Sequence, residues 1–467
     1  MNLSEGDAKQ LPLRDGRLPL AESNPSANRL QPTLNLVDAI ALTVGVVIGA
    51  GIFETPAFVA GEAGSVPALI LLWLAGGGIS LIGALCYAEL ATTYPHPGGN
   101  YHYLRMAMGK NVAFLFSWAR MTVMQPGSIV LIAFVLGDYA TQILSLGSYS
   151  ASIYAALAIV LFTGLNLLGV HPGKWVQRGL TVMEVLGLLL VVIVGLTIDA
   201  PDVPATAIAP EASGNLGLAM VLVLLSYGGW NEAAYISAEL RNVKRNMIRS
   251  LMWSIGIISG VYVLINLAYL HGLGLAGMVQ SQAVASDLLR QAIGEPGARW
   301  ISLLIVIATL GSLNATVFTG ARTNYALGRD FPSFAKLGRW HVQAHTPTQA
   351  LWVQGAISLA LVGLGSLNRS GFKTMVDFTS PIFWLFFLLT GIALLILRRK
   401  HPQQERPFRV PFYPLIPVLF CLVCGYMLYS SLAYTGTGAI VGGAILMLGL
   451  PVLLVMRRME ETVTNHS

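Results

Sequence analysis

The chain has 467 residues, of which 11% are charged and 55% are hydrophobic, and its mean hydropathy is +0.66. A soluble chain of this length would need about 25% charged residues to cover its domains, and a disordered chain would be poorer in apolar residues. The composition excludes both classes. It predicts an all-α polytopic membrane protein, with room for about a dozen spanning helices of ~20 residues each.

Twelve long apolar runs follow one another along the chain. Their hydrophobic residues are contiguous rather than alternating, as between Leu186 and Val194, so they indicate membrane helices and not barrel strands. The predicted spans cover residues 36–60, 66–92, 111–143, 150–170, 177–199, 215–240, 250–275, 300–328, 348–366, 376–397, 411–431 and 437–456.

The Lys and Arg residues indicate how these spans are oriented, because cytoplasmic loops are enriched in them. Most of the 28 fall in the two terminal tails and in every second loop, which predicts that both termini are cytoplasmic. This topology, together with contact between the basic clusters and anionic lipid, explains the net charge of +6. We therefore expect the lipid bilayer of the plasma membrane as the setting, and no nucleic acid partner.

Two spans contain paired glycines near their middle: Gly49 and Gly51 in the first, Gly228 and Gly229 in the sixth. Glycine-interrupted segments in corresponding halves of a sequence point to the binding site of a secondary transporter. The sixth span starts five spans after the first, and a repeat with an odd number of spans inverts the second copy. Free N–H groups and free carbonyls at such breaks suit the carboxylate and ammonium of a zwitterion. A small-residue packing face is the alternative.

Four segments carry a family resemblance: GVVIGAGIFETP (45–56), YAELATTYPHPGGNYHYLR (87–105), SYGGWNEAAYISAELRNVKRN (226–246) and GSLNATVFTGARTNYALGRD (311–330). Over about residues 33–456 the chain resembles the amino acid–polyamine–organocation superfamily, above all its L-type amino acid transporter branch and the bacterial amino acid permeases. The resemblance implies 12 transmembrane helices, as a LeuT-like 5+5 inverted repeat plus two C-terminal helices. The implied divisions are a cytoplasmic tail (1–33), two repeats (34–200 and 214–398), two further helices (399–456) and a second cytoplasmic tail (457–467).

The same resemblance implies a substrate site at the two breaks. The substrate carboxylate is expected on the backbone N–H groups of Ala50, Gly51 and Ile52, while the ammonium would meet backbone carbonyls around both breaks. Those carbonyls belong to Val47, Ile48, Leu225, Ser226 and Gly228, and the side chains of Trp230 and Asn231 would line the pocket. The branch has an aromatic gate residue where this sequence has Leu225, so Tyr227 and Trp230 are the candidates to replace it.

Ionisable residues inside a span need an explanation, because each costs at least ~2.5–3.5 kcal/mol at mid-membrane depth. We expect three there: Arg120, Glu184 and Glu232. Relatives commonly have a lysine at the position of Glu184. In this sequence Glu184 is a candidate to carry a coupling proton. An ion pair with Arg120 or hydrogen bonds to backbone are the alternatives. Glu232 is the one candidate carboxylate for a cationic substrate.

Polar residues near the inner ends of the spans have two interpretations each. Glu89 and Glu239 are expected either to form gate ion pairs or to be solvated helix ends, and the candidate partners are Arg105, Arg241 and Arg245. Ser312 and Asn314 in the eighth span offer oxygens to an ion or substrate, or else hydrogen bonds between helices.

No enzyme signature is present: the sequence contains no HExxH, no Walker A loop and no Cys/His metal spacing. We therefore expect no catalytic residue, no metal and no cofactor. The predicted function is secondary active transport of L-amino acids by alternating access, with neutral substrates favoured, as an exchanger or a proton-coupled symporter. Transport of cationic amino acids or polyamines is the alternative, and the oligomeric state stays open.

Overall fold

The computed structural model describes residues 34–49, 51–96, 98–169, 174–198, 214–234, 240–341, 346–367, 370–434 and 436–464. Within these ranges every regular element is a helix, apart from the isolated bridges Leu34–Leu240 and His341–Thr346. The predicted all-α architecture is confirmed for this part of the chain. Ala50, Glu239 and the predicted N-terminal tail (1–33) lie outside it.

Nine helices of the described ranges are long and apolar enough to cross a membrane, or ten if one bent pair counts as a span. The bent pair is α1 (Leu36–Val47) and α2 (Gly51–Ala63). The nine are α3 (Val66–Thr93), the run Lys110–Ile143, α7 (Ser150–Leu167), α10 (Val243–Gln280), α11 (Val284–Asp330), α12 (Thr348–Ser366), α13 (Gly371–Lys400), α14 (Leu415–Tyr434) and α15 (Thr437–Thr464).

Two shorter apolar helices lie where the fifth and sixth spans are predicted. They are the Val182–Thr197 part of α8 (Lys174–Thr197) and α9 (Leu216–Ser226), and the count of twelve spans stays a prediction. The run Lys110–Ile143 joins α5 (Lys110–Ala119) to α6 (Gln125–Ile143) through the π-helical turn η1 (Arg120–Met124).

Several short helical elements were not predicted, because hydropathy marks the lipid-crossing length and not the turns within or between spans. They include α4 (Asn100–Met108) and the 3₁₀ turns η2 (Trp230–Ala234) and η4 (Pro332–Phe334). The segments α10 and α11 also extend beyond their predicted spans. Positive φ angles of 67° at Gly274 and 77° at Gly294 interrupt them and turn the chain into added helical pieces.

The helices that lead into the two predicted breaks begin with the same device. The side chain of Asn35 accepts a hydrogen bond from the N–H of Asp38, and the side chain of Asn215 accepts one from the N–H of Leu218. An asparagine at this position satisfies one of the free donors of a first helical turn. Both helices therefore start at a residue that the sequence specifies.

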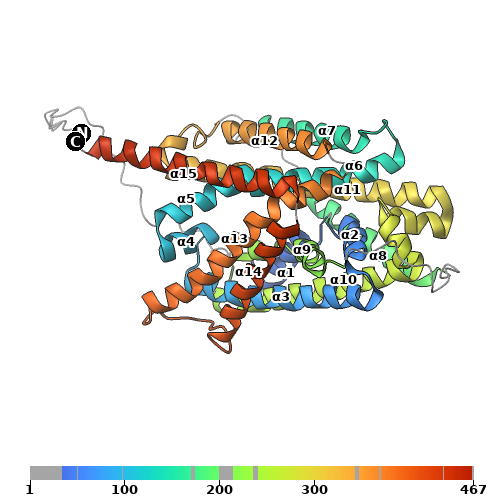
Figure 1. Ribbon diagram of the computed structural model, residues 1–467, viewed down its shortest axis with the longest axis horizontal. Helices are drawn as coiled ribbons and strands as arrows, with labels where there is room; N and C mark the ends of the chain where they lie inside the picture. The colour runs from blue at the N-terminus through green and yellow to red at the C-terminus, as the bar shows by residue number, and fades with distance from the viewer. Residues whose placement is uncertain are drawn as a thin grey trace, which may run out of the picture.

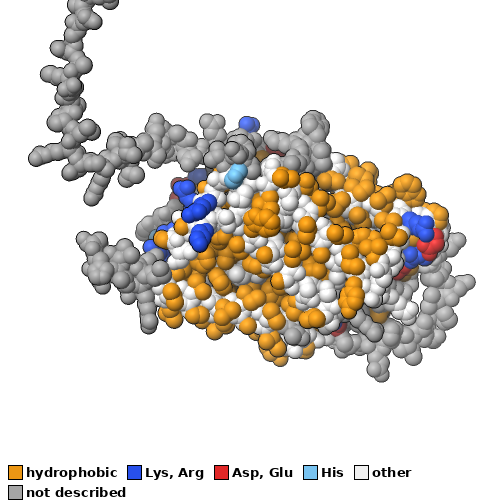
Figure 2. All heavy atoms as spheres, turned by 90° about the horizontal axis from the view of Figure 1, so that it is seen from above, with side chains coloured by type: hydrophobic (Ala, Val, Ile, Leu, Met, Phe, Trp, Pro, Cys, Tyr) orange, Lys and Arg blue, Asp and Glu red, His pale blue; other side chains and the backbone are white. Residues whose placement is uncertain are grey.

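The long helices run roughly along the longest axis of the molecule, with α3 beside α10 and α7 beside α12 (Figure 1). Many large apolar side chains are exposed, among them Leu71, Leu186, Leu422 and Leu448. Figure 2 shows hydrophobic side chains spread over the middle of one face, while Lys and Arg lie at both ends, next to Asp and Glu at the right-hand end. A soluble protein rarely exposes so large an apolar area, so this face fits contact with lipid.

Candidate functional site

The first predicted break is present. Helix α1 ends at Val47, where the N–H of Ile48 still donates to the carbonyl of Val44 at 2.7 Å, and α2 begins at Gly51 with its axis bent by 51°. Between them the N–H of Ile52 reaches the carbonyl of Gly49 only at 3.4 Å. The interruption of the first span is therefore confirmed.

The second break is equally clear at the end of α9 (Leu216–Ser226). Helix α9 ends at Ser226, the N–H of Gly228 donates to the carbonyl of Leu225 at 2.9 Å, and Gly229 has a φ of +109°. Residues with a Cβ rarely adopt that angle, which explains a glycine at this position. The chain continues in the 3₁₀ turn η2 rather than in the α-helix, so the interruption of the sixth span is also confirmed.

The two breaks lie against each other. A Cβ added to Gly229 would be 3.0 Å from Cγ1 of Val46 and 3.3 Å from the carbonyl oxygen of Val46. A Cβ added to Gly51 would be 3.7 Å from Oγ of Ser226. Residues from the two halves of the chain therefore meet closely, and at Gly229 an added Cβ would be tight enough to displace its neighbour on α1.

Tyr262 on α10 links the two breaks directly. Its hydroxyl lies 2.8 Å from the carbonyl oxygen of Val47 and 2.9 Å from that of Ser226, the last residues of α1 and α9. The ring is fully buried against Tyr227 and Trp73, with centroids 5.0 and 5.5 Å away. The sequence analysis missed this residue. The available signal was a tyrosine deep in an apolar run, whose hydroxyl needs a partner.

The two aromatic residues at the second break, Tyr227 and Trp230, contact other helices. The Trp230 ring packs edge-on against Tyr87 of α3, at 5.1 Å, and stacks on Phe387 of α13, at 5.8 Å. It lines a small cavity that also includes Gly228 and Phe387 and no residue of α1 or α2. The Tyr227 hydroxyl donates to the carbonyl of Trp73 at 3.0 Å, which fixes this candidate gate residue against α3.

The two charged residues flanking the sixth-span break neutralise each other. Arg120, at the start of the π-helical turn η1, lies with its guanidinium 3.5 Å from a carboxylate oxygen of Glu232. Asn231 lies beside them, with its amide nitrogen 3.4 Å from the other carboxylate oxygen. π-Helical turns recur at functional sites.

Glu184 does not pair with Arg120, so that alternative was wrong. Its side chain is buried, and its Oε1 has no hydrogen-bond partner among the residues that the structure describes. It lies close enough to Tyr262 to act on it electrostatically.

The prediction of three charged residues at membrane depth was incomplete. Glu54 on α2 and Asp377 on α13 are buried as well, and Asp138 on α6 is partly buried. Hydropathy averages over a window and does not register a single acid in an apolar run. Asn314 instead accepts a hydrogen bond from Asn166 at 2.9 Å, which confirms the interhelical alternative for that residue.

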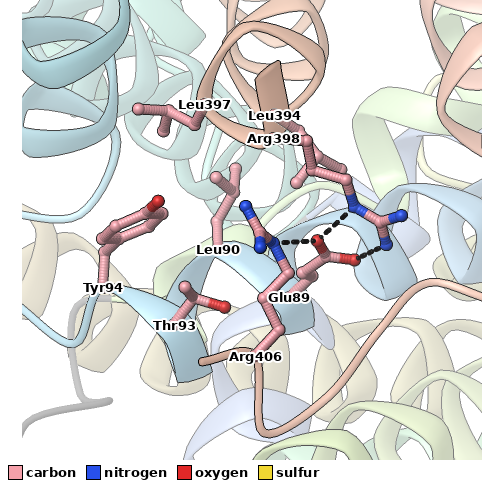
Figure 3. Close-up of a pocket in the computed structure, with 8 residues that line it drawn as sticks. All are labelled: Glu89, Leu90, Thr93, Tyr94, Leu394, Leu397, Arg398 and Arg406. Atoms are coloured by element: carbon pink, nitrogen blue, oxygen red, sulfur yellow. Dashed lines mark hydrogen bonds and ion pairs between the residues drawn. The ribbon is translucent and has the colours of Figure 1, made fainter. Parts of the chain in front are cut away.

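The inner end of α3 carries a buried ion cluster (Figure 3). Glu89 is 1% exposed and accepts two hydrogen bonds from the Arg398 guanidinium, at 2.6 and 2.5 Å. Arg406 lies 3.5 Å from the same carboxylate, which also accepts the N–H of Val410 at 2.7 Å. The predicted partner Arg105 was wrong, because the true partners come from the end of α13 and the loop that follows it.

Comparison with known proteins agrees with this geometry. The family description that matches residues 34–456 is "Amino acid permease". The b(0,+)-type amino acid transporter 1 of Rattus norvegicus is 32% identical over 428 residues, which cover 90% of this chain and 86% of that protein. The Large neutral amino acids transporter small subunit 2 of Mus musculus is 30% identical over 445 residues, which cover 92% and 82% respectively. The chain therefore belongs to the amino acid permease family of the amino acid–polyamine–organocation superfamily, a family of multi-pass membrane transporters and not of enzymes.

Proposed function

We propose that this permease moves L-amino acids, neutral ones in preference, across the plasma membrane by alternating access. The observation that carries the proposal is the contact between the two helix breaks. The carboxylate binds the backbone N–H groups of Ala50, Gly51 and Ile52, and the ammonium binds carbonyls at the ends of α1 and α9. The remaining proposed contacts are the carbonyls of Val47, Ile48, Leu225, Ser226 and Gly228, with Trp230 and Asn231 beside them.

The pairing of Glu232 supports the preference for neutral substrates. A cationic side chain would need a carboxylate whose charge is not already balanced, and Glu232 lies beside Arg120. A substrate cation would have to compete with that guanidinium and would lose the hydrogen bonds it makes in water. Transport of cationic amino acids or polyamines is the second candidate. It would require the substrate cation to replace the Arg120 guanidinium beside Glu232.

The packing of the helices supports the proposed twelve spans and inverted repeat. Helices α2, α3, α6 and α7 of the first half pack on α9, α10, α11 and α12 of the second, each on its proposed counterpart. Contacts outside these pairs also recur in inverted form: α8 packs on α11 as α13 packs on α6, and α1 packs on α10 as α9 packs on α3. A two-fold axis in the membrane plane requires this pattern.

The proposed orientation places both termini in the cytoplasm, and the concentration of Lys and Arg in the terminal tails and in every second loop of the sequence supports it. Transport proceeds as amino acid exchange or with a proton. Glu184 remains a candidate for the proton, because its Oε1 atom is buried and has no hydrogen-bond partner among the described residues.

An uptake screen tests the proposal. The purified protein is reconstituted in liposomes and offered each labelled L-amino acid and polyamine, with and without a proton or sodium gradient and with and without internal amino acid. We expect uptake of neutral amino acids to exceed that of lysine or putrescine. Uptake of cations alone would favour the second candidate, and no uptake of any amino acid would overturn the proposal.

A further inference from the structure

Two acidic side chains that the proposed site does not use lie near each other, one in the first turn of α2 and one near the end of α6. Glu54 is on α2, one turn beyond Gly51, and is 6% exposed. Asp138 is on α6, between one and two turns before that helix ends at Ile143, and is partly buried. In the proposed orientation both helices end on the outer side of the membrane.

A contact between their sequence neighbours holds these two acids close. The Tyr139 hydroxyl donates to the carbonyl of Phe53 at 2.8 Å, and the two rings meet edge to face with centroids 6.3 Å apart. Because Phe53 precedes Glu54 and Tyr139 follows Asp138, this hydrogen bond keeps the two acidic residues near each other. The carboxyl groups are near enough for their charges to repel each other.

No basic side chain of the described ranges forms an ion pair with Glu54 or Asp138. The Oε2 atom of Glu54 is buried without a hydrogen-bond partner there. The hydroxyl of Tyr269 on α10 is also buried and has no such partner, and it lies within electrostatic range of Glu54. The space around Glu54 and Tyr269 thus contains two buried polar groups, each of which lacks a hydrogen-bond partner among the described residues.

The other charged groups around this space are already paired. Asp287 of α11 acts on Tyr139 and forms an ion pair with Arg290. Arg290 also binds Glu295, at 2.7 Å, and the side chain of Gln142, at 3.1 Å. Helices α3 and α9 also pack on α2. The nearby hydroxyl of Tyr227, at the end of α9, already donates a hydrogen bond to the carbonyl of Trp73 on α3. Nothing on these helices offsets a second negative charge at Glu54 and Asp138.

Two carboxyl groups that share a water-poor site cannot both ionise without strong repulsion. A single proton held between them removes that repulsion and lets one carboxyl donate to the other. Carboxyl groups within membrane spans commonly mark proton pathways for this reason. Asp138, the more exposed of the two, provides the contact with outer water through which the proton enters.

We propose that Glu54 and Asp138 bind one proton between them from the outer side, and that this proton accompanies the amino acid through the transport cycle. The bound proton favours the arrangement in which α2 packs on α6. Its loss drives the carboxylates apart and moves α2, whose first turn carries the proposed carboxylate site. The inference rests on the proposed function for its transport role, but the proton site itself does not depend on it.

Uptake of labelled leucine into proteoliposomes, measured over about pH 5 to 8 outside, tests the coupling. We expect wild-type uptake to rise with acidity by up to about tenfold per pH unit, the limit for one bound proton. Glu54→Gln and Asp138→Asn should be nearly insensitive to pH while still exchanging leucine for leucine. The matched control is Glu62→Gln at the end of the same helix, which should keep the wild-type profile.

Three results of that assay would overturn the inference and leave the proposed function standing. The first is wild-type uptake that does not depend on pH, and the second is a wild-type profile in Glu54→Gln. The third is a profile that only Glu184→Gln flattens, which would assign the proton to Glu184.

Thermal unfolding of the purified protein tests the proton site without any substrate. The folded pair holds a proton that the unfolded chain releases above about pH 5, so wild-type stability should fall relative to Glu54→Gln as the pH rises to 8. Parallel losses of melting temperature in the two proteins would refute the proton site. If leucine uptake were absent at every pH while the melting temperatures of wild type and Glu54→Gln diverged, the proposed function alone would be refuted.

Discussion

Replacing Gly229 by alanine should stop transport without unfolding the protein. The φ of +109° makes any residue with a Cβ strained there, at a cost of about 1–3 kcal/mol. The added Cβ would also lie 3.0 Å from Cγ1 of Val46 and 3.3 Å from its carbonyl oxygen, so α1 must move by a few tenths of an ångström. Because that movement displaces the proposed carbonyl ligands of the substrate ammonium, we expect uptake to fall about tenfold or more, equivalent to ~1.4 kcal/mol.

A matched variant separates strain from contact. Gly147, between α6 and α7, has a φ of +102°, but an added Cβ there has no atom within 4 Å. Initial rates of leucine uptake and melting temperatures should be measured for Gly229→Ala and Gly147→Ala in the same liposomes and detergent. Both should lose stability, and only Gly229→Ala should lose transport. Equal loss of uptake in the two variants would show that backbone strain, and not the meeting of the breaks, is responsible.

Three further outcomes are expected. Tyr262→Phe removes the hydroxyl beside two helix-end carbonyls and should lower the unfolding free energy by about 1–3 kcal/mol, because a buried carbonyl loses its donor; an unchanged melting temperature would contradict this. Glu89→Gln removes the charge between two arginines and should lower the unfolding free energy by about 3–5 kcal/mol, whereas a loss below ~1 kcal/mol in chemical unfolding would show that the cluster is not stabilising. Burial, with His96 and Arg105, lowers the pKa of His102 on α4 to about 4. An unfolded histidine titrates near ~6.5, so the unfolded chain binds more protons between these values and wild-type stability falls as the pH drops through them. His102→Gln should therefore lose less melting temperature over that window, and equal losses would show that this histidine is not responsible.

The sequence predicted the helix breaks because their signal is local. Paired glycines in an apolar run identify backbone that cannot continue as helix, and Gly49–Gly51 and Gly228–Gly229 lie at the ends of α1 and α9. The start of each of these helices was equally readable from its asparagine. Helix boundaries at Gly274 and Gly294 were not, because the pieces beyond them are not apolar enough to register.

The contacts that connect distant helices were not predictable in the same way. Glu89 finds Arg398 and Arg406 across more than three hundred residues, so its partner is chosen by tertiary packing and not by spacing along one helix. A lone tyrosine such as Tyr262 is also ordinary in a membrane span. Only the fold shows that its hydroxyl lies beside two carbonyls that belong to different halves of the chain.

The Tyr262 hydroxyl determines how many hydrogen-bond donors the two helix-end carbonyls have before a substrate binds. Tyr262 carries a single hydrogen and faces two helix-end carbonyls, those of Val47 and Ser226, so it can satisfy only one of them at a time. The protein thus contains a built-in deficit of one donor between its two halves. An ammonium group brings three hydrogens to that point and removes the deficit, and a substrate without one leaves it unfilled.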